Sequence, residues 1–229
     1  AGTIFRCLDP GLTLANELED GASLRHGDVI FRVTGKVRSI LQAERLVLNV
    51  MQRMSGIATQ TRRYVDRVEG TGTQILDTRK TTPGFRCFEK EAVRIGGGVN
   101  HRTGLYDMIL IKDNHIDFAG GIRQAIEGTR SYLDEKSLEL PIEIETRSLE
   151  DVRKVLEIGG VDRIMLDNFS VEQTREAVTL IDHAFETESS GGITLETIAG
   201  YARCGVDYIS VGALTHQVHS LDLSLKADF

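Results

Sequence analysis

The sequence has few cysteines, no long apolar run and no dinucleotide signature, and each absence excludes a class of protein. Its three cysteines lie far apart and are an odd number, which fits neither a disulfide framework nor a CxxC metal site. No apolar run reaches the length of a membrane-spanning helix, so we expect no membrane partner. No GxGxxG follows the first predicted parallel strand, which argues against a dinucleotide fold. No signal peptide is visible, and we expect a cytoplasmic protein with reduced thiols.

Charge is distributed unevenly along the chain. The formal net charge of −7 argues against nucleic acid as the main partner. Residues 78–112 nevertheless hold seven Lys or Arg against three acids, with a histidine in the same stretch. An acidic chain that concentrates cations in one segment is typical of an anion-binding site. A solvated basic surface would give the same count, so charge alone leaves both interpretations open.

The spacing of apolar residues divides the chain into two parts. Residues 1–38 read as short strands and turns, with a strand at 29–33, and residues 39–69 have helical spacing. Ser55-Gly56 predicts a break of that helical segment into two helices. Predicted strands then alternate with predicted helices, the strands at 74–76, 108–111, 142–144, 163–166, 185–187 and 208–211 and the helices at 120–133, 149–158, 171–183 and 195–204. This alternation predicts parallel βα units.

Each predicted strand runs directly into polar residues. The strand ends lead to Asp77-Thr78-Arg79-Lys80, Lys112-Asp113-Asn114-His115, Glu145-Thr146, Asp167-Asn168, Glu188-Ser189-Ser190-Gly191-Gly192 and Gly212 with Thr215-His216. In a parallel barrel all these ends meet at the face that carries the active site. An open doubly wound sheet would bring only some of them to a ligand crevice. Six strands ending in functional groups therefore favour closure into a barrel.

Small residues end the last two predicted strands, at Ser190-Gly191-Gly192 and Ser210-Val211-Gly212. They let backbone N–H groups approach a phosphate, and a following helix N-terminus adds a favourable dipole. Barrels often bind phosphate after strands seven and eight. Turn glycines without a ligand are the alternative.

Cations and carboxylates of the same predicted face are candidates for binding. Arginine can hold a carboxylate or phosphate in two contacts, and lysine offers a point charge. The candidate cations are Arg79, Lys80, His101, Arg102 and Lys112. Ion pairs with Asp77, Asp107 or Asp113 are the alternative. Gly96-Gly97-Gly98 predicts a turn that lets His101 and Arg102 face the mouth, although a flexible loop without ligand contact is equally compatible.

Two single carboxylates, Glu145 and Asp167, also lie at predicted strand ends. They could hold ribose hydroxyls or a hydrated Mg²⁺ ion. They could equally neutralise the neighbouring lysines, and the sequence leaves both roles open.

Taken in order, these motifs resemble the quinolinate phosphoribosyltransferase family of type II phosphoribosyltransferases over nearly the whole chain. The residues that carry the resemblance are Glu44-Arg45-Leu46 with Asn49, the run 52–59, the run 76–84, Gly96-Gly97-Gly98-Val99-Asn100-His101-Arg102, Ile111-Lys112-Asp113-Asn114-His115, Glu143-Ile144-Glu145, Leu166-Asp167-Asn168-Phe169, Ser190-Gly191-Gly192-Ile193 and the run 210–216. Many ordered motifs are far more specific than any one of them. Ser189 departs from the Ala of many relatives, a small change that should not disturb the loop.

The resemblance implies an α/β fold, an incomplete βα (TIM-like) barrel joined to a small open-faced α/β sandwich N-terminal domain. Family members carry further residues before the position of Ala1, so we expect only part of that N-terminal domain. The implied division is a partial N-terminal domain with connecting helices at 1–69, the catalytic barrel at 70–216, and a C-terminal segment at 217–229 that returns to the N-terminal domain.

The resemblance also implies a reaction. Phosphoribosyl passes from phosphoribosyl pyrophosphate to quinolinate with decarboxylation, giving nicotinate mononucleotide, pyrophosphate and CO2 in de novo NAD biosynthesis, with Mg²⁺ as cofactor. The implied roles are quinolinate binding by Arg45, Arg79, His101, Arg102 and Lys112, binding of phosphoribosyl pyrophosphate and its metal by Lys80, Glu145 and Asp167, binding of the 5-phosphate by Ser190, Gly191 and Gly212, and a place near the pyrophosphate for His216. Lys80, Lys112, Glu145 and Asp167 would be catalytic. Arg45 would come from the neighbouring subunit of a homodimer, or of a higher oligomer built from it.

Two other functions remain as alternatives. A phosphoribosyltransferase of the same fold could use a different acceptor, although the cations at Arg79, Arg102 and Lys112 suit a dicarboxylate. Residues 20–35 loosely resemble the turn-rich strands of lipoyl or biotinyl carrier domains. That segment holds no carrier lysine in a turn, because Lys36 follows Gly35, which argues against a carrier.

Overall fold

The computed structural model describes residues 1–228, and the first of them form a small unit. Helix α1 (Gly2–Leu8) packs beside two antiparallel strands, β1 (Thr13–Asn16) and β2 (Phe31–Thr34). Phe5 and Leu12 are buried there, and the Phe5 ring meets Phe31 edge-on with centroids 6.0 Å apart. The prediction of only strands and turns over residues 1–38 is wrong at α1, whose few residues do not show a full helical period.

One long helix, α2 (Val37–Arg67), links this small unit to the rest of the molecule. Ala43 and Val47 pack in the small core with Phe5, whereas Ile57 belongs to the main core. The predicted break at Ser55-Gly56 is wrong, because the helix continues through both residues. Glycine is needed there for packing instead: a Cβ at Gly56 would lie 2.3 Å from the carbonyl oxygen of His219.

A six-stranded parallel sheet forms the main part of the protein. Its strands are β3 (Gln74–Leu76), β4 (Ile109–Ile111), β5 (Ile142–Thr146), β6 (Arg163–Asp167), β7 (Glu186–Ser190) and β8 (Tyr208–Ser210), in the order β3-β8-β7-β6-β5-β4. All neighbours pair in parallel, so all carboxyl ends lie at one edge. The predicted strand 185–187 is wrong in extent, since β7 continues to Ser190 and places Glu188 and Ser189 inside the strand.

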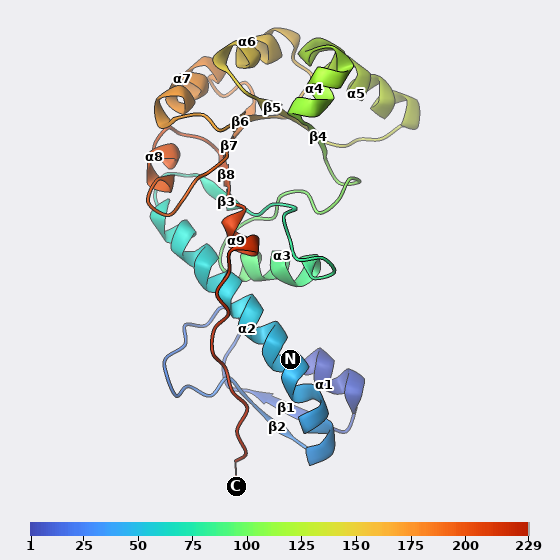
Figure 1. The fold of residues 1–229 in the computed structure, drawn as a ribbon, viewed down its shortest axis with the longest axis vertical. Helices are drawn as coiled ribbons and strands as arrows, with labels where there is room; N and C mark the ends of the chain where they lie inside the picture. The colour runs from blue at the N-terminus through green and yellow to red at the C-terminus, as the bar shows by residue number, and fades with distance from the viewer. Residues whose placement is uncertain (229) are drawn as a thin grey trace.

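The helices that follow the strands cover the outer side of the sheet. They are α5 (Ile122–Lys136), α6 (Leu149–Ile158), α7 (Val171–Ile181) and α8 (Ile198–Ala202), and Figure 1 shows them around the convex side of an arc of strands. Three further helices, α3 (Arg86–Ile95), α4 (Asp113–Ala119) and α9 (Ala213–His216), were not predicted. Helix α3 buries the charged Glu89 and Lys90 beside Ala92 and Val93, and two adjacent apolar residues are too few to show helical spacing in the sequence.

The sheet remains open along residues 1–228, because β3 and β4 are its two edges and do not pair. The six strand ends lie on one side of the sheet, as predicted. The described strands do not, however, close into a complete hydrogen-bonded barrel. Residues 77–108 span the gap between the edges, and Leu76 of β3 makes one parallel bridge to Val99 in this stretch.

The C-terminal segment runs back along α2. The Leu221 N–H donates to the carbonyl oxygen of Gln52 at 3.1 Å, and the Gln52 side chain donates to the carbonyl oxygen of Leu223 at 2.8 Å. Asp228 lies 3.3 Å from Arg32 of β2. Residue 229, the last of the expected segment 217–229, lies outside the described residues. None of the described helices combines the length and the apolar character needed to cross a membrane.

Candidate active site

The carboxyl ends of neighbouring strands bring the candidate residues together. Lys112 directly follows β4, Glu145 lies near the end of β5, and Asp167 ends β6. Asp167 pairs in register with Ser190, the last residue of β7. The predicted strand-end positions of these four residues therefore correspond to one edge of the sheet.

Lys112 and Glu145 form an ion pair, with Lys112 Nζ 2.8 Å from Glu145 Oε1. The Asp113 N–H donates to the other carboxylate oxygen at 3.3 Å. The Lys112 side chain is 47% exposed and that of Glu145 only 11%, so the ammonium is open to solvent beside a largely covered carboxylate. The sequence left two roles open for Glu145, and in this structure it neutralises a neighbouring lysine.

Asp167 is the second carboxylate at this edge. Burial, and then the negative charge of Glu145, raise its pKa above the usual value. Asn168 donates its side-chain N–H to Asp167 at 2.8 Å. A carboxylate whose pKa is raised by burial and by a neighbouring carboxylate suits a divalent cation, which would favour its ionised form.

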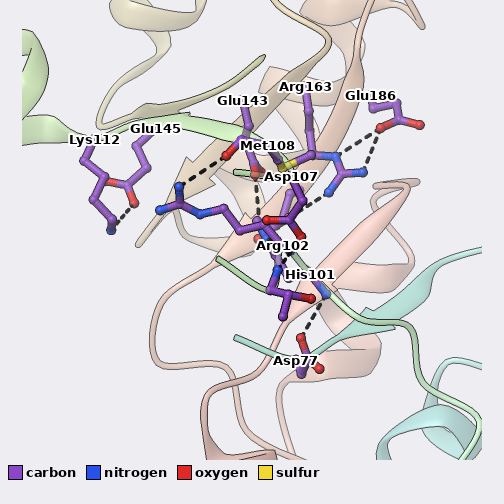
Figure 2. A network of polar contacts seen from close by, with 12 residues as sticks. Asp77, His101, Arg102, Asp107, Met108, Lys112, Glu143, Glu145, Arg163 and Glu186 are labelled. Atoms are coloured by element: carbon purple, nitrogen blue, oxygen red, sulfur yellow. Dashed lines mark hydrogen bonds and ion pairs between the residues drawn. The ribbon is translucent and has the colours of Figure 1, made fainter. Parts of the chain in front are cut away.

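Two guanidinium groups lie close together beside this pair. Burial, and then the charge of Arg79, lower the pKa of Arg102. Arg102 makes one long contact to the carbonyl oxygen of Met108 at 3.4 Å, and the buried Arg79 Nε has no partner among the described residues. Figure 2 shows the Arg102 side chain extending toward the Lys112–Glu145 pair. Adjacent cations with an unused donor suit an anionic ligand.

The last strand contributes a small cluster around Gly212. A Cβ at Gly212 would lie 2.8 Å from His216 Nε2 and 3.5 Å from Lys80 Cδ, so these two side chains lie over the glycine. The Thr215 hydroxyl donates to the Lys80 carbonyl oxygen at 2.8 Å. This arrangement brings Lys80 and His216 together at the end of β8.

The loop after β7 packs tightly on the loop after β6. The Asn168 N–H donates to the Ser190 carbonyl oxygen at 2.8 Å. Gly191 has a φ of 96°, and a Cβ there would lie 2.2 Å from Asn168 Oδ1. Only glycine suits both the left-handed backbone and this approach, which leaves main-chain amides rather than a side chain at the surface of the loop.

His101 is directed into the interior rather than toward the strand ends. Its side chain is 7% exposed, and Nε2 lies 2.9 Å from Glu143 Oε2 and 3.3 Å from Glu188 Oε2. Neither contact has the geometry of a linear hydrogen bond. The prediction that Gly96-Gly97-Gly98 turns both His101 and Arg102 to the mouth is thus inaccurate for the imidazole. A Cβ at Gly96 would lie 2.5 Å from the Ala58 carbonyl oxygen, so that glycine serves packing against α2.

A buried ion pair, not predicted from the sequence, supports the backbone of this segment. Lys90 Nζ lies 2.5 Å from Asp77 Oδ1, and both side chains are almost fully buried. Lys90 also donates to the His101 carbonyl oxygen at 2.8 Å, while the His101 N–H donates to Asp77 at 2.9 Å. Burial raises the pKa of Asp77. The carboxylate anticipated as a partner of Arg79 or Lys80 therefore pairs with Lys90.

A second unpredicted pair joins α2 to α3. Arg53 contacts the fully buried Glu89 at 2.8 Å and donates to the Thr215 carbonyl oxygen at 2.6 Å. Glu89 in turn accepts from the N–H and the hydroxyl of Thr82 at 3.0 and 2.8 Å. Neither Arg53 nor Glu89 lies at the end of a strand, so the pattern of polar residues after strands could not identify them.

Arg45 lies apart from the other candidates. It is exposed on α2 between Ala43 and Val47, which pack in the small core. Ile57, which belongs to the main core, is about 18 Å further along the helix at 1.5 Å per residue. The described part of the chain holds no hydrogen bond or ion pair made by the Arg45 side chain. The structure thus does not bring Arg45 to the strand ends of its own sheet.

Comparison with known proteins was made after this geometry was established. Residues 57–226 match the model of the quinolinate phosphoribosyl transferase C-terminal domain, and residues 1–55 match that of the N-terminal domain. Quinolinate phosphoribosyltransferase [decarboxylating] 1b of Nicotiana tabacum is 47% identical over all of this chain and 69% of its own length. Nicotinate-nucleotide pyrophosphorylase [carboxylating] of Mycobacterium leprae is 48% identical over 94% of this chain and 75% of its own length.

Solved structures give the same result. The crystal structure of NadC from Streptococcus pyogenes is 42% identical, with a TM-score of 0.92 over 99% of this chain and 79% of that one. The nicotinate-nucleotide pyrophosphorylase from Francisella tularensis is 41% identical, with a TM-score of 0.91 over 97% of this chain. The two family models, the curated relatives and the solved structures agree, and the chain belongs to the quinolinate phosphoribosyltransferase family.

Proposed function

We propose that this protein transfers the phosphoribosyl group of phosphoribosyl pyrophosphate to quinolinate with loss of CO2, giving nicotinate mononucleotide and pyrophosphate for NAD biosynthesis. The observation that carries the proposal is the gathering of Arg79, Arg102 and Lys112 beside Glu145 and Asp167, in a chain that belongs to this family. The two substrates are both anions, so fixed cations must offset the Coulomb energy of bringing them together.

The acceptor is held by its two carboxylates in this proposal. Arg79, Arg102 and Lys112 contribute bidentate contacts or a point charge, and the Arg45 of a partner subunit adds a further cation. His101, whose ring faces the interior, would contribute through its contact with the Arg102 N–H. Two observations support this assignment. The Arg79 Nε donor has no partner among the described residues, and burial together with the charge of Arg79 lowers the pKa of Arg102, so an anion bound between the two side chains would be favourable.

The donor substrate occupies the other half of the edge. Main-chain amides at Ser190, Gly191 and Gly212 would hold the 5-phosphate, and His216 would lie near the pyrophosphate. The approach of Asn168 to Gly191, and of His216 and Lys80 to Gly212, supports this assignment. Lys80, with Lys112, Glu145 and Asp167, would carry the catalytic step.

Mg²⁺ is the cofactor we propose, held by Glu145 and Asp167 largely through substrate oxygens and water. The residues suit it, because both groups are oxygen ligands and the pKa of Asp167 is raised by its neighbour. When bound, the ion would neutralise charge on the pyrophosphate leaving group. Glu145 and Asp167 would also stabilise positive charge on the ribose carbon as the pyrophosphate departs.

Decarboxylation then needs no added base. Once the ring nitrogen bears the ribose, its positive charge stabilises the electron pair that stays on the neighbouring ring carbon when CO2 leaves, and that carbon then takes up a proton from water. Arg79, Arg102 and Lys112 therefore act mainly by positioning the quinolinate nitrogen at the ribose carbon.

The test is to incubate the protein with quinolinate and phosphoribosyl pyrophosphate, with and without Mg²⁺, and to measure nicotinate mononucleotide. We expect product only when both substrates and the ion are present. Replacing quinolinate with nicotinate should abolish turnover. Turnover of another acceptor in preference to quinolinate would instead support a same-fold phosphoribosyltransferase with a different substrate.

We further propose a homodimer in which Arg45 serves the partner's site. The support is its place on the half of α2 that packs in the small core, far along the helix from the sheet. Arg45→Ala and Lys112→Ala chains, unfolded and refolded together, should recover about a quarter of full activity, because about half the dimers are mixed and half of their sites are whole. No recovery, with mixed dimers shown to form, would contradict the exchange.

Three broader assignments complete the proposal. The open parallel sheet would be an incomplete βα barrel, with residues 70–216 as the catalytic domain and 1–69 as a partial α/β sandwich. Residues 217–229 would be a segment returning to that sandwich, as the Gln52 contacts of the described part suggest. A cytoplasmic location agrees with three cysteines that are all unpaired thiols.

A further inference from the structure

The two arginines proposed to hold the acceptor lie on segments without regular secondary structure. Arg79 belongs to residues 77–82, which follow β3, and Arg102 belongs to residues 100–108, which precede β4. Because neither segment is a strand, no sheet ladder sets the distance between them. The two guanidinium groups also repel each other, since burial, and then the charge of Arg79, lower the pKa of Arg102. Other contacts must therefore hold these side chains beside each other before an anion binds.

Arg86, the first residue of α3, contacts both segments with one guanidinium group. Its Nη2 donates to the Arg79 carbonyl oxygen at 3.3 Å, and its Nη1 donates to the carbonyl oxygen of Thr103, the residue after Arg102, at 2.9 Å. Its Nε donates to the Thr81 hydroxyl at 3.0 Å. Each nitrogen of Arg86 thus has a protein partner, whereas the buried Arg79 Nε has none among the described residues. Arg86 therefore binds the protein's own backbone, and Arg79 keeps a donor for a ligand.

A second cation on the same face of α3 repeats this connection. Lys90 lies four residues after Arg86, so both side chains project from one side of the helix. Lys90 pairs with Asp77 of the first segment and donates to the His101 carbonyl oxygen of the second at 2.8 Å. Asp77 also accepts the His101 N–H at 2.9 Å, a contact drawn in Figure 2. Helix α3 therefore contacts the backbone immediately before and immediately after Arg102.

We propose that Arg86 is a positioning residue that sets the separation of Arg79 and Arg102, and thereby fits the site to two carboxylates on adjacent ring atoms. The proposal rests on the proposed function for the identity of the acceptor, whereas the contacts of Arg86 do not depend on it. Arg86 acts through the backbone of the two arginines and does not itself touch substrate. Lys90 supports the same segments, but its ion pair is almost fully buried, so a substitution there would disturb folding as well.

This role depends on the shape of the guanidinium group rather than on its charge. A planar guanidinium presents its donors in a fixed fork, which lets one group reach two carbonyl oxygens and a hydroxyl at once. A lysine ammonium keeps the positive charge but is a compact point donor, so it can satisfy only part of this set. Without the bridge, binding of a dicarboxylate must also order both segments, and this ordering weakens binding. Arg86→Lys therefore separates positioning from electrostatic attraction.

The half of the site proposed for the donor substrate should change much less. Lys80 lies next to Arg79, but its carbonyl oxygen accepts from the Thr215 hydroxyl at 2.8 Å and is held independently of Arg86. Within the described chain, Arg86 donates no hydrogen bond to the proposed phosphate loops. Loss of its contacts should thus raise KM for quinolinate and spare KM for phosphoribosyl pyrophosphate.

Binding of two isomeric dicarboxylates, measured by titration calorimetry, tests the proposal without turnover. Phthalate has its carboxylates on adjacent ring carbons, and isophthalate has them one carbon further apart. The wild type should bind phthalate about tenfold or more tightly than isophthalate. Arg86→Lys should bind phthalate about tenfold more weakly than the wild type, and its preference over isophthalate should fall to about threefold or less.

Steady-state kinetics supply the second readout. In Arg86→Lys, KM for quinolinate should rise about tenfold, while KM for phosphoribosyl pyrophosphate should stay within about twofold of the wild type. Arg94→Lys is the matched control, because it makes the same exchange on the same helix at an exposed side chain that pairs with Glu91. Its affinities and both KM values should equal those of the wild type.

Wild-type affinity and preference for phthalate in Arg86→Lys would overturn the proposal, as would equal rises in both KM values or a wild type that does not prefer phthalate. If Arg86→Lys does not fold, nuclear magnetic resonance of the Arg86 Nε–H in the wild type decides instead. Slow exchange of this proton with water supports the bridge, and exchange as fast as that of the exposed Arg94 contradicts it. A preference for phthalate that is lost in Arg86→Lys, without turnover of quinolinate by the wild type, would contradict the proposed function and support the role of Arg86.

Discussion

The two faces of the parallel sheet are made by the same strands but by different classes of residue. On β5, Ile142 and Ile144 belong to the main apolar core, whereas Glu143 and Glu145 project from the opposite face. On β6, Ile164 and Leu166 join the core, while Arg163 and Asp167 do not. The outer face therefore packs against the helices, and the inner face carries the charges that we propose for binding and catalysis. A substitution on one face should disturb one of these properties and spare the other.

The largest effect is expected from breaking the outer face. Ile164 is fully buried in the main core, so Ile164→Ala should lower the free energy of unfolding by about 4 kcal/mol. Urea unfolding followed by circular dichroism measures this change. The fraction that remains folded should keep the wild-type KM for quinolinate. A loss of less than about 1 kcal/mol would show that the outer face does not hold the sheet together.

The inner face should respond in the opposite way. Arg102→Ala and Lys112→Ala should each lower kcat/KM by about 10²-fold or more, on the order of 3 kcal/mol, because each removes a charge-assisted contact to an anion. Both side chains lie beside the sheet edge rather than in the apolar core, so the unfolding midpoint should hardly move. Near-wild-type turnover by either variant would remove that residue from the site.

The pH dependence of stability sharpens the comparison, because Glu143, a buried carboxylate of the inner face, has its pKa raised into the neutral range. The pKa of Glu143 is about 7 in the folded protein and near 4.5 unfolded, so its contribution is fully present below the unfolded pKa and is lost as pH rises through about 7. The free energy of unfolding of the wild type should fall by about 3 kcal/mol relative to Glu143→Gln between about pH 5 and about pH 8. Parallel stability curves for the two proteins would contradict a buried proton on Glu143.

Ligand competition gives the smallest expected difference. Phthalate keeps two adjacent carboxylates and lacks the ring nitrogen, so it should compete with quinolinate for the cations of the inner face. Nicotinate has one carboxylate and should inhibit at least about tenfold more weakly than phthalate. A tenfold difference corresponds to about 1.4 kcal/mol for one lost contact. Inhibition constants for the two compounds measure this difference, and equal inhibition would argue against dicarboxylate recognition.

The same contrast explains how much the sequence alone could predict. Apolar spacing predicts the outer face well, and helix α6 begins and ends at the predicted residues 149 and 158. The strand-end positions of Lys112, Glu145 and Asp167 follow from the same pattern, because a strand's end is a local property. The resemblance of ordered motifs adds the family, which local spacing could not supply.

The partners on the inner face could not be predicted in this way. Glu143 meets His101 and Glu188 only because three distant segments are brought together by the order of strands in the sheet. The pairing of Lys90 with Asp77 likewise depends on how α3 packs, and two of the four buried residues of α3 are charged, so apolar spacing did not identify that helix. The alternation of Glu143 with Glu145, and of Glu186 with Glu188, was a visible signal of a charged inner face.

The most direct test of the whole account is the stoichiometry of the reaction. Quinolinate labelled in the carboxylate that is lost would be incubated with phosphoribosyl pyrophosphate, Mg²⁺ and the protein, while CO2, pyrophosphate and nicotinate mononucleotide are counted together. The account predicts that the three products form in equal amounts and that about a hundredfold less of each forms with Arg102→Ala at the same enzyme concentration over the same time. Pyrophosphate released without CO2, or CO2 released without phosphoribosyl pyrophosphate, would contradict it.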